Sequence, residues 1–407
     1  MVLMPVAEAL RQVLAGAEPL GTETVALDDA FGRVLATDVA ARRTQPPADV
    51  SAMDGYAVRA DDTASEPSTL TIIGEVAAGH PFEGKVGPGE AARIFTGGVV
   101  PEGADCVVIQ EVTEREGNRV VIKRSGIKGK NIRRKGIDFS EGQALLARGR
   151  RLDDRDLMLA ASMNHAQVAV HRRPKVAIIG TGDELVMPGA EPRPGEIVYS
   201  NGFALTALAR AEGAEARDFG IARDNLDDIC AYIRRARDWG ADILVTTGGA
   251  SVGEHDLVQK ALKAEGLDLS FWRVALRPGR PMMHGRFARD GLGAMHVLGV
   301  PGNPVSSYVC SVLFLVPLIR KLSGRADIER ARETARLGRD LPENDEREDY
   351  LRATLTFGPD GPVATPVSSQ DSSLMAHLSR ADCLVIRPPN APAAATGSSC
   401  AILKLAL

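Results

Sequence analysis

A glycine-rich loop between a short apolar strand pattern and a helix pattern, at residues 241–256, constrains this chain more than any other stretch. Its sequence, ADILVTTGGASVGEHD, places Gly248 and Gly249 just after the apolar run, and helical spacing begins at Leu257. Glycines let a backbone approach a ligand closely, and the free N–H groups of a helix start attract negative charge. The stretch therefore predicts an α/β protein with an anion site.

Two acidic residues, Glu254 and Asp256, end the same loop. Carboxylates and a phosphate repel one another unless a cation lies between them. Mg²⁺ commonly takes its oxygen ligands from one or two carboxylates and from substrate phosphates. We therefore expect a phosphorylated ligand that binds together with Mg²⁺.

Strand and helix patterns alternate over residues 174–325. This alternation predicts a parallel sheet covered by helices on both faces, in three layers. Ligands of such sheets bind beyond the carboxyl ends of the strands. Three loops follow expected strands, at 180–184, 246–256 and 301–307, and Asp224 follows another. We therefore expect these four segments to meet at one edge of the sheet.

The rest of the chain has a different pattern. Short β runs separated by glycines fill residues 45–142, and similar runs with prolines fill 330–407. These patterns predict an inserted β domain and a C-terminal β domain. The two segments that flank the insertion in the sequence, residues 1–44 and 143–173, are then expected to form one elongated domain together. Residues 174–325 are expected to form the α/β domain. The predicted fold class is multidomain α/β plus β.

Two further helices are expected. Residues 144–170 have a helical pattern around RLDDRDLMLAASM. The most apolar run, Tyr308–Ile319, is too short to span a bilayer and contains Pro317, so we expect a buried helix there. The first 16 residues have neither a basic start nor a continuous apolar core, which disfavours a signal peptide.

Composition narrows the class of protein. A chain of 407 residues needs several domains, and 44% hydrophobic with 25% charged residues is typical of a soluble globular protein. A net charge of −4 disfavours a nucleic-acid binder. The five cysteines form no C-x-x-C pair, which favours a reducing compartment and gives no zinc motif. We expect a cytoplasmic protein with neither nucleic acid nor membrane as partner.

Several candidate site residues have two interpretations. Asp183, Glu184 and Asp224 stand where helices begin, so they are either helix caps or, with Asp256, metal ligands or a general base. Asp54 precedes a glycine, as in many turns that have no further function.

The basic candidates are equally ambiguous. Arg273, Arg277 and Arg280 surround the RPGRP turn and suit bidentate oxyanion binding, although solvated turn residues explain them too. Ser306 lies in PGNPVSS, which is either a hydroxyl-bearing anion loop or a plain capped turn. The basic run in GIKGKNIRRKGID is most simply a solvated hairpin.

Seven motifs occur in one order along the chain: SAMDGYAV, RIFTGGVVPEGADCVV, GKNIRRKGID, TGDEL, TTGGASVGEHD, RPGRP and PGNPVS. Together they closely resemble the MoeA family of molybdopterin molybdenumtransferases (molybdate insertases) and the matching domain of gephyrin-type proteins, over nearly the full length. The resemblance implies a four-domain protein whose α/β domain is similar to the MogA adenylyltransferase. It implies a Mg²⁺-dependent insertion of molybdate into adenylated molybdopterin, with release of AMP.

The resemblance also implies a homodimer whose cleft lies between the α/β domain of one subunit and the inserted domain of the other. It implies transient contact with a MogA-type adenylyltransferase and with molybdoenzyme maturation proteins. The catalytic positions that it implies are Asp54, Thr96, Asp138, Glu184, Asp224 and Asp256, of which Glu184, Asp224 and Asp256 hold the metal. The substrate-binding positions are Gly248, Gly249, Ser251, Arg273, Arg277, Arg280, Pro301, Ser306, Arg352 and Ser372.

Three departures from the family pattern change local charge. Arg277 and Arg280 stand where the family commonly has lysine, Ile137 stands where an acid usually precedes Asp138, and Asp371 replaces a usual glycine. A tungsten-inserting or inactive paralogue therefore stays open. So does an adenylyltransferase or nucleotide pyrophosphatase related to MogA, because such domains carry a similar TTGG loop. A pure scaffold protein is disfavoured, since the chain has neither a fused adenylyltransferase domain nor a long linker.

Overall fold

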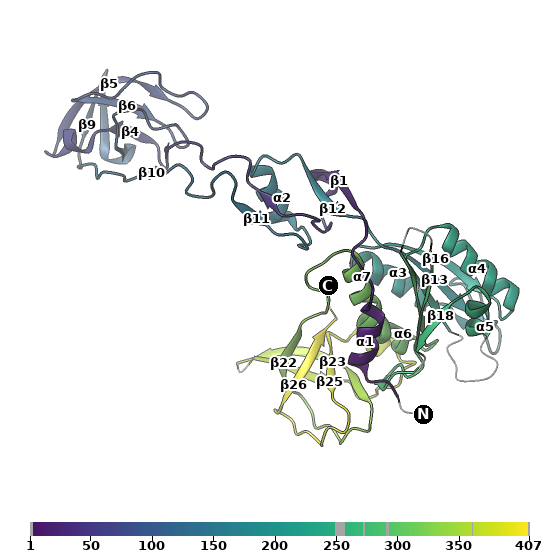
Figure 1. The fold of residues 1–407 in the computed structure, drawn as a ribbon. Helices are drawn as coiled ribbons and strands as arrows, with labels where there is room; N and C mark the ends of the chain where they lie inside the picture. The colour runs from purple at the N-terminus through teal and green to yellow at the C-terminus, as the bar shows by residue number, and fades with distance from the viewer. Residues whose placement is uncertain (1–2, 249–256, 272, 290–292, 360, 406–407) are drawn as a thin grey trace.

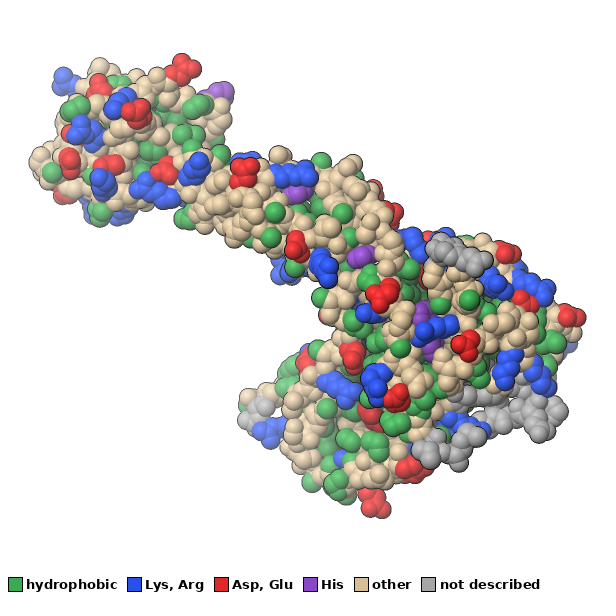
Figure 2. Space-filling model, in the orientation of Figure 1, with side chains coloured by type: hydrophobic (Ala, Val, Ile, Leu, Met, Phe, Trp, Pro, Cys, Tyr) green, Lys and Arg blue, Asp and Glu red, His purple; other side chains and the backbone are tan. Residues whose placement is uncertain are grey.

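The computed structural model describes residues 3–248, 257–271, 273–289, 293–359 and 361–405. These residues form an elongated molecule with a β domain at one end, a slender neck, and an α/β domain beside a C-terminal β domain at the other end (Figure 1). Figure 2 shows that the neck is narrower than either end. The predicted fold class, multidomain α/β plus β, is confirmed. The exact domain boundaries stay predictions.

The β domain at the far end, called here the distal β domain, contains a six-stranded sheet with the order β7-β4-β6-β5-β9-β8. Its strands are β4 (Gly55–Val58), β5 (Ser68–Val76), β6 (Glu90–Ile94), β7 (Cys106–Ile109), β8 (Thr113–Glu116) and β9 (Arg119–Ile122). A two-stranded ribbon of β3 (Val50–Ser51) and β10 (Ile132–Arg133) completes the domain near the neck. Leu70, Val120 and Ile122 pack in its core, because alternate side chains of a strand point to one face.

The neck consists of two strand pairs and one helix. It pairs β1 (Thr22–Ala26) with β12 (Gln167–His171) and β2 (Val39–Ala40) with β11 (Ala144–Leu146), around α2 (Asp154–Ser162). The expectation of a helix over 144–170 is wrong at both ends. Helix α2 begins only at a capping box, in which Asp153 and Asp156 each accept the other's backbone N–H, and the alternating QVAVH segment forms β12 instead.

The α/β domain has three layers around a six-stranded sheet with the order β16-β13-β17-β21-β20-β18. The strands are β13 (Lys175–Thr181), β16 (Glu215–Ala222), β17 (Ile243–Thr247), β18 (Asp268–Phe271), β20 (Met283–Phe287) and β21 (Met295–Val300). Alternate residues of β13 face opposite layers: Ile178 packs in one apolar cluster, and Ala177 and Ile179 pack in the other. The sequence predicts this three-layer arrangement correctly.

Helices cover both faces of this sheet. They are α3 (Asn201–Ala211), α4 (Leu226–Asp238), α5 (Leu257–Ala264), α6 (Pro304–Cys310) and α7 (Val316–Leu322), with a π-helical turn at Ser311–Leu315. The N-terminal helix α1 (Val6–Leu14) packs on the face that carries α3, α6 and α7.

The expectation of a wholly parallel sheet is wrong. β16, β13, β17 and β21 are parallel, but β20 and β18 run antiparallel to their neighbours. Antiparallel neighbours need only short connections, whereas parallel neighbours need a long crossover such as a helix. The chain has short connections here and no crossover helix in the described residues between β18 and β21.

The apolar segment from α6 to α7 is a core helix. Within the described residues, Pro304–Leu322 is the one helix long and apolar enough to cross a membrane. Of its most apolar 18-residue stretch, 83% is buried inside the molecule. The predicted buried helix is therefore confirmed.

The C-terminal β domain closes on itself. Its sheet has the order β19-β23-β24-β22-β26-β25, and an additional β23–β25 pairing joins the ends. The strands are β19 (Leu276–Arg277), β22 (Arg332–Leu337), β23 (Glu348–Gly358), β24 (Gly361–Pro366), β25 (Cys383–Arg387) and β26 (Ser399–Lys404), with a short helix α8 (Met375–Ser379). Because β19 comes from the RPGRP segment, this pairing ties the α/β domain to the C-terminal domain.

Candidate active site

The carboxyl ends of four parallel strands meet at one edge of the α/β sheet, as predicted. Strand registers align Thr181 with Ala222 and align Thr247 with both Gly180 and Val300. The loops that follow β13, β16, β17 and β21 therefore begin side by side. We call these four loops, together with the RPGRP turn and residues 369–374 described below, the proximal site.

Acidic residues gather where β13 and β16 end. The Asp183 amide donates to Asp224 Oδ2 at 3.4 Å, and the Asp224 amide donates to Asp183 Oδ1 at 3.2 Å. Glu184 is exposed, and its carboxylate lies over Gly182, where an added Cβ would come within 2.4 Å of Glu184 Oε2. The structure thus brings the loops of Glu184 and Asp224 together, with Asp183 between them.

These carboxylates fit Mg²⁺ in chemistry but do not form a complete protein site. Hard carboxylate oxygens are what Mg²⁺ prefers, and it usually takes its remaining ligands from water and substrate phosphates. Within the described residues, no group of three His, Cys, Asp or Glu side chains that could hold a metal is present. Asp256, the third expected ligand, lies outside the described residues, as do Gly249 and Ser251.

Gly248, which follows β17, packs tightly against its neighbours. Gly248 has a positive φ of 92°, and an added Cβ there would come within 2.5 Å of the Thr181 carbonyl oxygen. A Cβ on Gly302 would lie 3.6 Å from Gly248 Cα. Asn201 Nδ2, at the start of α3, donates to the Gly302 carbonyl at 2.8 Å. The positive φ and the contact with Thr181 require a glycine at position 248.

The loop after β21 also contacts the C-terminal β domain. Asn303 Nδ2 donates to Ser372 Oγ at 3.0 Å, and the Val305 amide donates to the Ser372 carbonyl at 3.2 Å. Ser306 is 4% exposed, and Pro301 is buried in the same loop. The predicted substrate positions in PGNPVS and near Ser372 therefore lie next to each other.

Arg352 holds the Ser372 loop, defined as residues 369–374. Its side chain is 1% exposed, and it donates to the carbonyls of Asp371 at 2.9 Å and Leu374 at 3.1 Å. It also donates to Gln370 Oε1 and to the Ser369 carbonyl. Burial lowers the pKa of Arg352. Because backbone acceptors engage this guanidinium, the structure gives it a positioning role in the loop.

Arg277 lies among acidic groups of the C-terminal domain. It donates to Asp345 Oδ2 at 3.1 Å and to Asn344 Oδ1 at 2.9 Å, and it pairs with the buried Asp349. The pKa of Asp345 is lowered to about 2, mainly by a hydrogen bond from the Arg347 side chain, and the nearby charge of Arg277 lowers it further. Burial raises the pKa of Asp349, and Arg277 opposes that rise.

The other two predicted arginines differ from Arg277. Arg280 is exposed and Arg273 is half-buried, and neither side chain has a hydrogen bond or ion pair with another described residue. They are therefore the basic groups of this turn that remain available to an anion.

The distal β domain carries a second group of candidates. Thr96 donates to Asp54 Oδ1 from its amide at 2.7 Å and from its hydroxyl at 2.8 Å. These bonds lower the pKa of Asp54, with a smaller contribution from Arg93. Asp138 is exposed near the neck, where its amide donates to the Gln45 carbonyl at 3.1 Å. We call Asp54, Thr96 and Asp138 the distal site.

The neck separates the distal site from the proximal site within one chain (Figure 1). The structure therefore joins Asp54 to Thr96 and gathers the loops of the α/β edge, but it does not bring the two groups of residues together in one copy.

Comparisons with known proteins cover nearly the whole chain. Residues 4–164 match the family described as the MoeA N-terminal region (domains I and II), 177–321 match a probable molybdopterin binding domain, and 334–405 match the MoeA C-terminal region (domain IV). A molybdopterin molybdenumtransferase of Nostoc sp. is 37% identical, covering 94% of this chain and 89% of the relative. One of Bacillus subtilis is 36% identical, covering 95% of this chain and 90% of the relative.

This chain belongs to the MoeA family of molybdopterin molybdenumtransferases.

A solved structure agrees with the assignment. The molybdopterin biosynthesis MoeA protein of Pyrococcus horikoshii has a TM-score of 0.85 at 29% identity, covering 99% of this chain and 100% of that one. The fold of this MoeA-family chain is thus shared over its full length.

Sequence reasoning missed several residues that shape the site in this MoeA-family chain. Asn201 and Asn303 tie the loop after β21 to α3 and to the C-terminal domain. Beside the distal site, the Arg93 guanidinium lies 4.6 Å from the Phe95 ring centroid and 5.2 Å from that of Tyr56. Asn303 lies inside the PGNPVS motif and Asn201 at the start of α3, but their partners are distant in sequence, so local pattern could not identify them.

Proposed function

We propose that the protein catalyses a step of molybdenum cofactor biosynthesis, the insertion of molybdate into adenylated molybdopterin with release of AMP. The observation that carries the proposal is the meeting of the strand-end loops with the Ser372 loop, through Asn303. One wall of this junction has the glycine-rich loops and carboxylates that suit a pyrophosphate, and the other has hydroxyl and arginine groups that suit an oxyanion.

The pyrophosphate side uses the loops of β13, β16 and β17. At the end of β17, Gly248 lets the backbone turn close against Thr181, and Gly249 and Ser251 follow it in the sequence. Glu184, Asp224 and Asp256 would hold Mg²⁺, which neutralises phosphate charge when bound. Phosphoanhydride cleavage depends mainly on positioning and charge neutralisation, so the proposal needs no protein nucleophile.

The oxyanion side uses the RPGRP turn and the Ser372 loop. Arg273 and Arg280 supply available positive charge, while Arg277 would have to share its donors between an anion and its acidic partners. Ser306 and Ser372 supply hydroxyls, and Pro301 shapes the same loop. Arg352 keeps the Ser372 loop in place through its backbone carbonyls.

The distal site requires a second copy of the chain. Asp54, Thr96 and Asp138 lie beyond the neck from the proximal site of their own chain (Figure 1). We propose a homodimer in which the distal site of one subunit faces the proximal site of the other. A symmetric dimer then contains two such composite sites, because a twofold interface repeats every contact.

We also propose a cytoplasmic location, since all five cysteines are free thiols, as expected in a reducing compartment. The adenylated substrate would come from a MogA-type adenylyltransferase, and the product would pass to molybdoenzyme maturation proteins. Both contacts are proposed to be transient.

The test supplies purified protein with adenylated molybdopterin, Mg²⁺, and either molybdate or tungstate. We expect AMP release that depends on the oxyanion, with one metal incorporated into the pterin per AMP released. A larger yield with tungstate would assign the protein to tungsten insertion. Hydrolysis of a nucleotide without molybdopterin, and no oxyanion-dependent AMP, would contradict the proposal and favour a nucleotide pyrophosphatase.

A further inference from the structure

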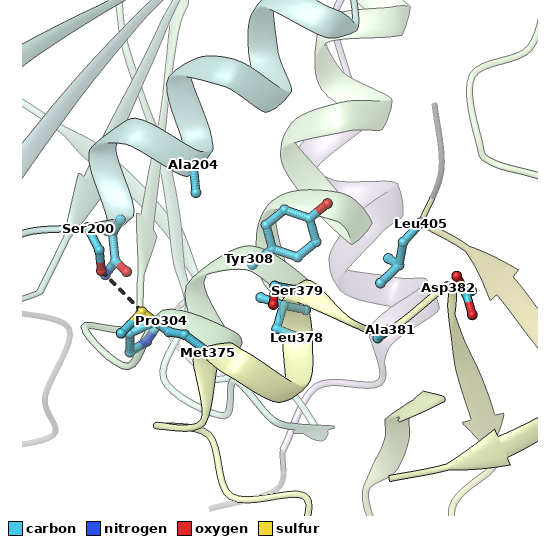
Figure 3. A pocket seen from close by; sticks show the side chains of 11 residues that line it. Ser200, Ala204, Pro304, Tyr308, Met375, Leu378, Ser379, Ala381, Asp382 and Leu405 are labelled. Carbon is cyan, nitrogen blue, oxygen red and sulfur yellow. Dashed lines mark hydrogen bonds between the residues drawn. The ribbon is translucent and has the colours of Figure 1, made fainter. Parts of the chain in front are cut away.

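A pocket of about 480 Å³ lies between the α/β domain and the C-terminal β domain, beside the loop after β21 (Figure 3). Ala204 of α3 lines one side, Tyr308 of α6 lies centrally, and Leu378 of α8 lines the other side. A volume of this size is within the range of small-molecule sites. The pocket therefore has room for a ring system between two domains.

The wall chemistry suits an aromatic ring better than a phosphate. Pro304, Tyr308, Met375 and Leu378 give the pocket a mainly apolar surface. Tyrosine stacks favourably on other aromatic rings, and a methionine sulfur packs well against ring edges. An anion would lose its hydration in such a pocket without gaining charged partners.

One end of the pocket lies beside the proximal site. Asn201 lines the pocket and donates to the Gly302 carbonyl, and Gly302 packs against Gly248. Ser200 Oγ donates to Met375 Sδ at 3.5 Å and links α3 with α8 (Figure 3). A ligand in the pocket therefore lies next to Gly248 and the loop after β21, which is where its phosphates would be placed.

The exposed Asp382 lines the other end of the pocket, at its rim. Asp382 Oδ2 accepts a hydrogen bond from the Leu355 amide at 2.8 Å. Its second oxygen has no hydrogen-bond partner in the part of the chain that the structure describes. A carboxylate accepts hydrogen bonds readily, so an amino group on a ring is a suitable partner.

We propose that this pocket binds the fused, amino-bearing heteroaromatic ring of the substrate, a purine or a pterin, with its amino group at Asp382 and its phosphates at the proximal site. The inference rests on the proposed function, which supplies both kinds of ring. It goes further by assigning α3, α6 and α8 as the walls of the ring subsite, and it makes Ala204, Tyr308 and Leu378 determinants of substrate binding.

A matched pair of variants tests the pocket. Ala204→Phe fills it from the exposed side of α3, whereas Ala207→Phe puts the same side chain at an exposed position of α3 that does not line the pocket. Titration calorimetry of the full-length protein measures binding of AMP and of 6-hydroxymethylpterin. We expect Ala204→Phe to weaken binding of one or both rings about tenfold or more, a change of about 1.4 kcal/mol, and Ala207→Phe to leave it unchanged.

The two probes distinguish the sources of the ring. Weaker binding of AMP alone assigns the pocket to the purine, and weaker binding of the pterin alone assigns it to the pterin. Asp382→Asn is a second variant, which keeps the acceptor for Leu355 but removes the charge, and it should weaken the same ring. Unchanged affinity for both rings in a folded Ala204→Phe protein overturns the proposal, as does a wild-type protein that binds neither.

Failure of the pocket and failure of the proposed function give different results. If the wild-type protein releases AMP in a molybdate-dependent reaction but Ala204→Phe and Ala207→Phe both bind the rings as tightly as the wild type, only the pocket assignment is wrong. If the wild-type protein releases no AMP under those conditions, the proposed function itself is wrong, whatever the calorimetry shows.

Discussion

The proximal and distal sites are built in opposite ways. The proximal site depends on contacts between domains, such as the Asn303–Ser372 hydrogen bond and the Arg277–Asp349 ion pair. The distal site centres on one local pair, Asp54 and Thr96, on neighbouring segments of a single sheet. Substitutions in the proximal site should therefore often alter structure and binding together, while those in the distal site should alter turnover alone.

The difference suggests a division of labour. The proximal site combines carboxylates, close-packed backbones and arginines, which are the groups that bind a phosphorylated ligand and an oxyanion. The distal site presents an ionised, hydrogen-bonded carboxylate at an exposed surface. Neither site contains the complete set of groups that the proposed reaction uses.

The largest effect is expected at Glu184. Glu184→Ala should abolish molybdate-dependent AMP release, lowering its rate about 10³-fold, because it removes a charge that helps to hold the phosphates and Mg²⁺. The fold should stay intact, since the side chain is exposed. Rate measurements with Glu191→Ala as control check the prediction, because Glu191 is another exposed acid of the same loop region. Normal turnover in Glu184→Ala would sink the assignment.

Arg352→Ala should affect stability and binding together. Removal of this buried guanidinium leaves the carbonyls of Asp371 and Leu374 without their donor, at a cost of about 2–4 kcal/mol in the free energy of unfolding. The Ser372 loop should then move, and molybdate affinity should fall about tenfold or more.

The control for this prediction is Arg352→Lys. A lysine keeps the charge but cannot reproduce the forked donor geometry of arginine, so it should not restore binding. Denaturant unfolding and equilibrium titration with molybdate measure the two quantities. Recovery of both in Arg352→Lys would show that charge alone matters at this position.

Acid should weaken the α/β domain before the distal β domain. His284 and His296 are stacked in the α/β core, where burial lowers their pKa values to about 3 and about 4. In the unfolded chain both histidines take up protons as the pH falls through 6.5, whereas in the folded core they stay neutral until a much lower pH. Their contribution to the free energy of unfolding is therefore fully present above pH 6.5 and is lost progressively below it. The loss between pH 7.5 and 5.5 should be about 2–3 kcal/mol for the pair.

Tryptophan fluorescence can follow this loss, because both tryptophans, at positions 239 and 272, belong to the α/β region of the sequence and none belongs to residues 45–142. His284→Leu should remove about half of the pH dependence. His80→Gln, at an exposed position of the distal β domain, should leave it unchanged. Equal pH dependence in all three proteins would show that the buried pair is not its cause.

Arg277→Ala should have the smallest effect. Its donors already serve Asp345, Asn344 and Asp349, so its loss should weaken molybdate binding only about tenfold. Equilibrium titration against Arg380→Ala, a change at an exposed arginine of the C-terminal domain, measures the difference. Unchanged affinity would remove Arg277 from the oxyanion site.

The sequence predicted those features that depend on local pattern. Apolar runs followed by glycines identified the strand-end loops, and the geometry of parallel strands then required Glu184 and Asp224 to lie at one edge. Burial of β13 on both faces followed from its continuous apolar run.

The errors and omissions concern contacts between distant segments. The antiparallel β18 and β20 depend on which strands pair, and strand pairing is not a local property. The same holds for the carbonyl partners of Arg352 and for the acids around Arg277, about 70 residues away. Residue type suggested an oxyanion role for both arginines, whereas their actual partners depend on how the domains pack.

Subunit complementation tests most directly whether the proximal and distal sites act across two subunits. Asp54→Ala and Glu184→Ala should each be inactive alone. After mixing and complete subunit exchange, half of the dimers are hybrids of the two variants. Each hybrid has two composite sites, and in one of them both Asp54 and Glu184 are intact. AMP release should therefore recover to about a quarter of the wild-type rate. If the two variants stay inactive after exchange is shown to be complete, the proposed arrangement across subunits is wrong.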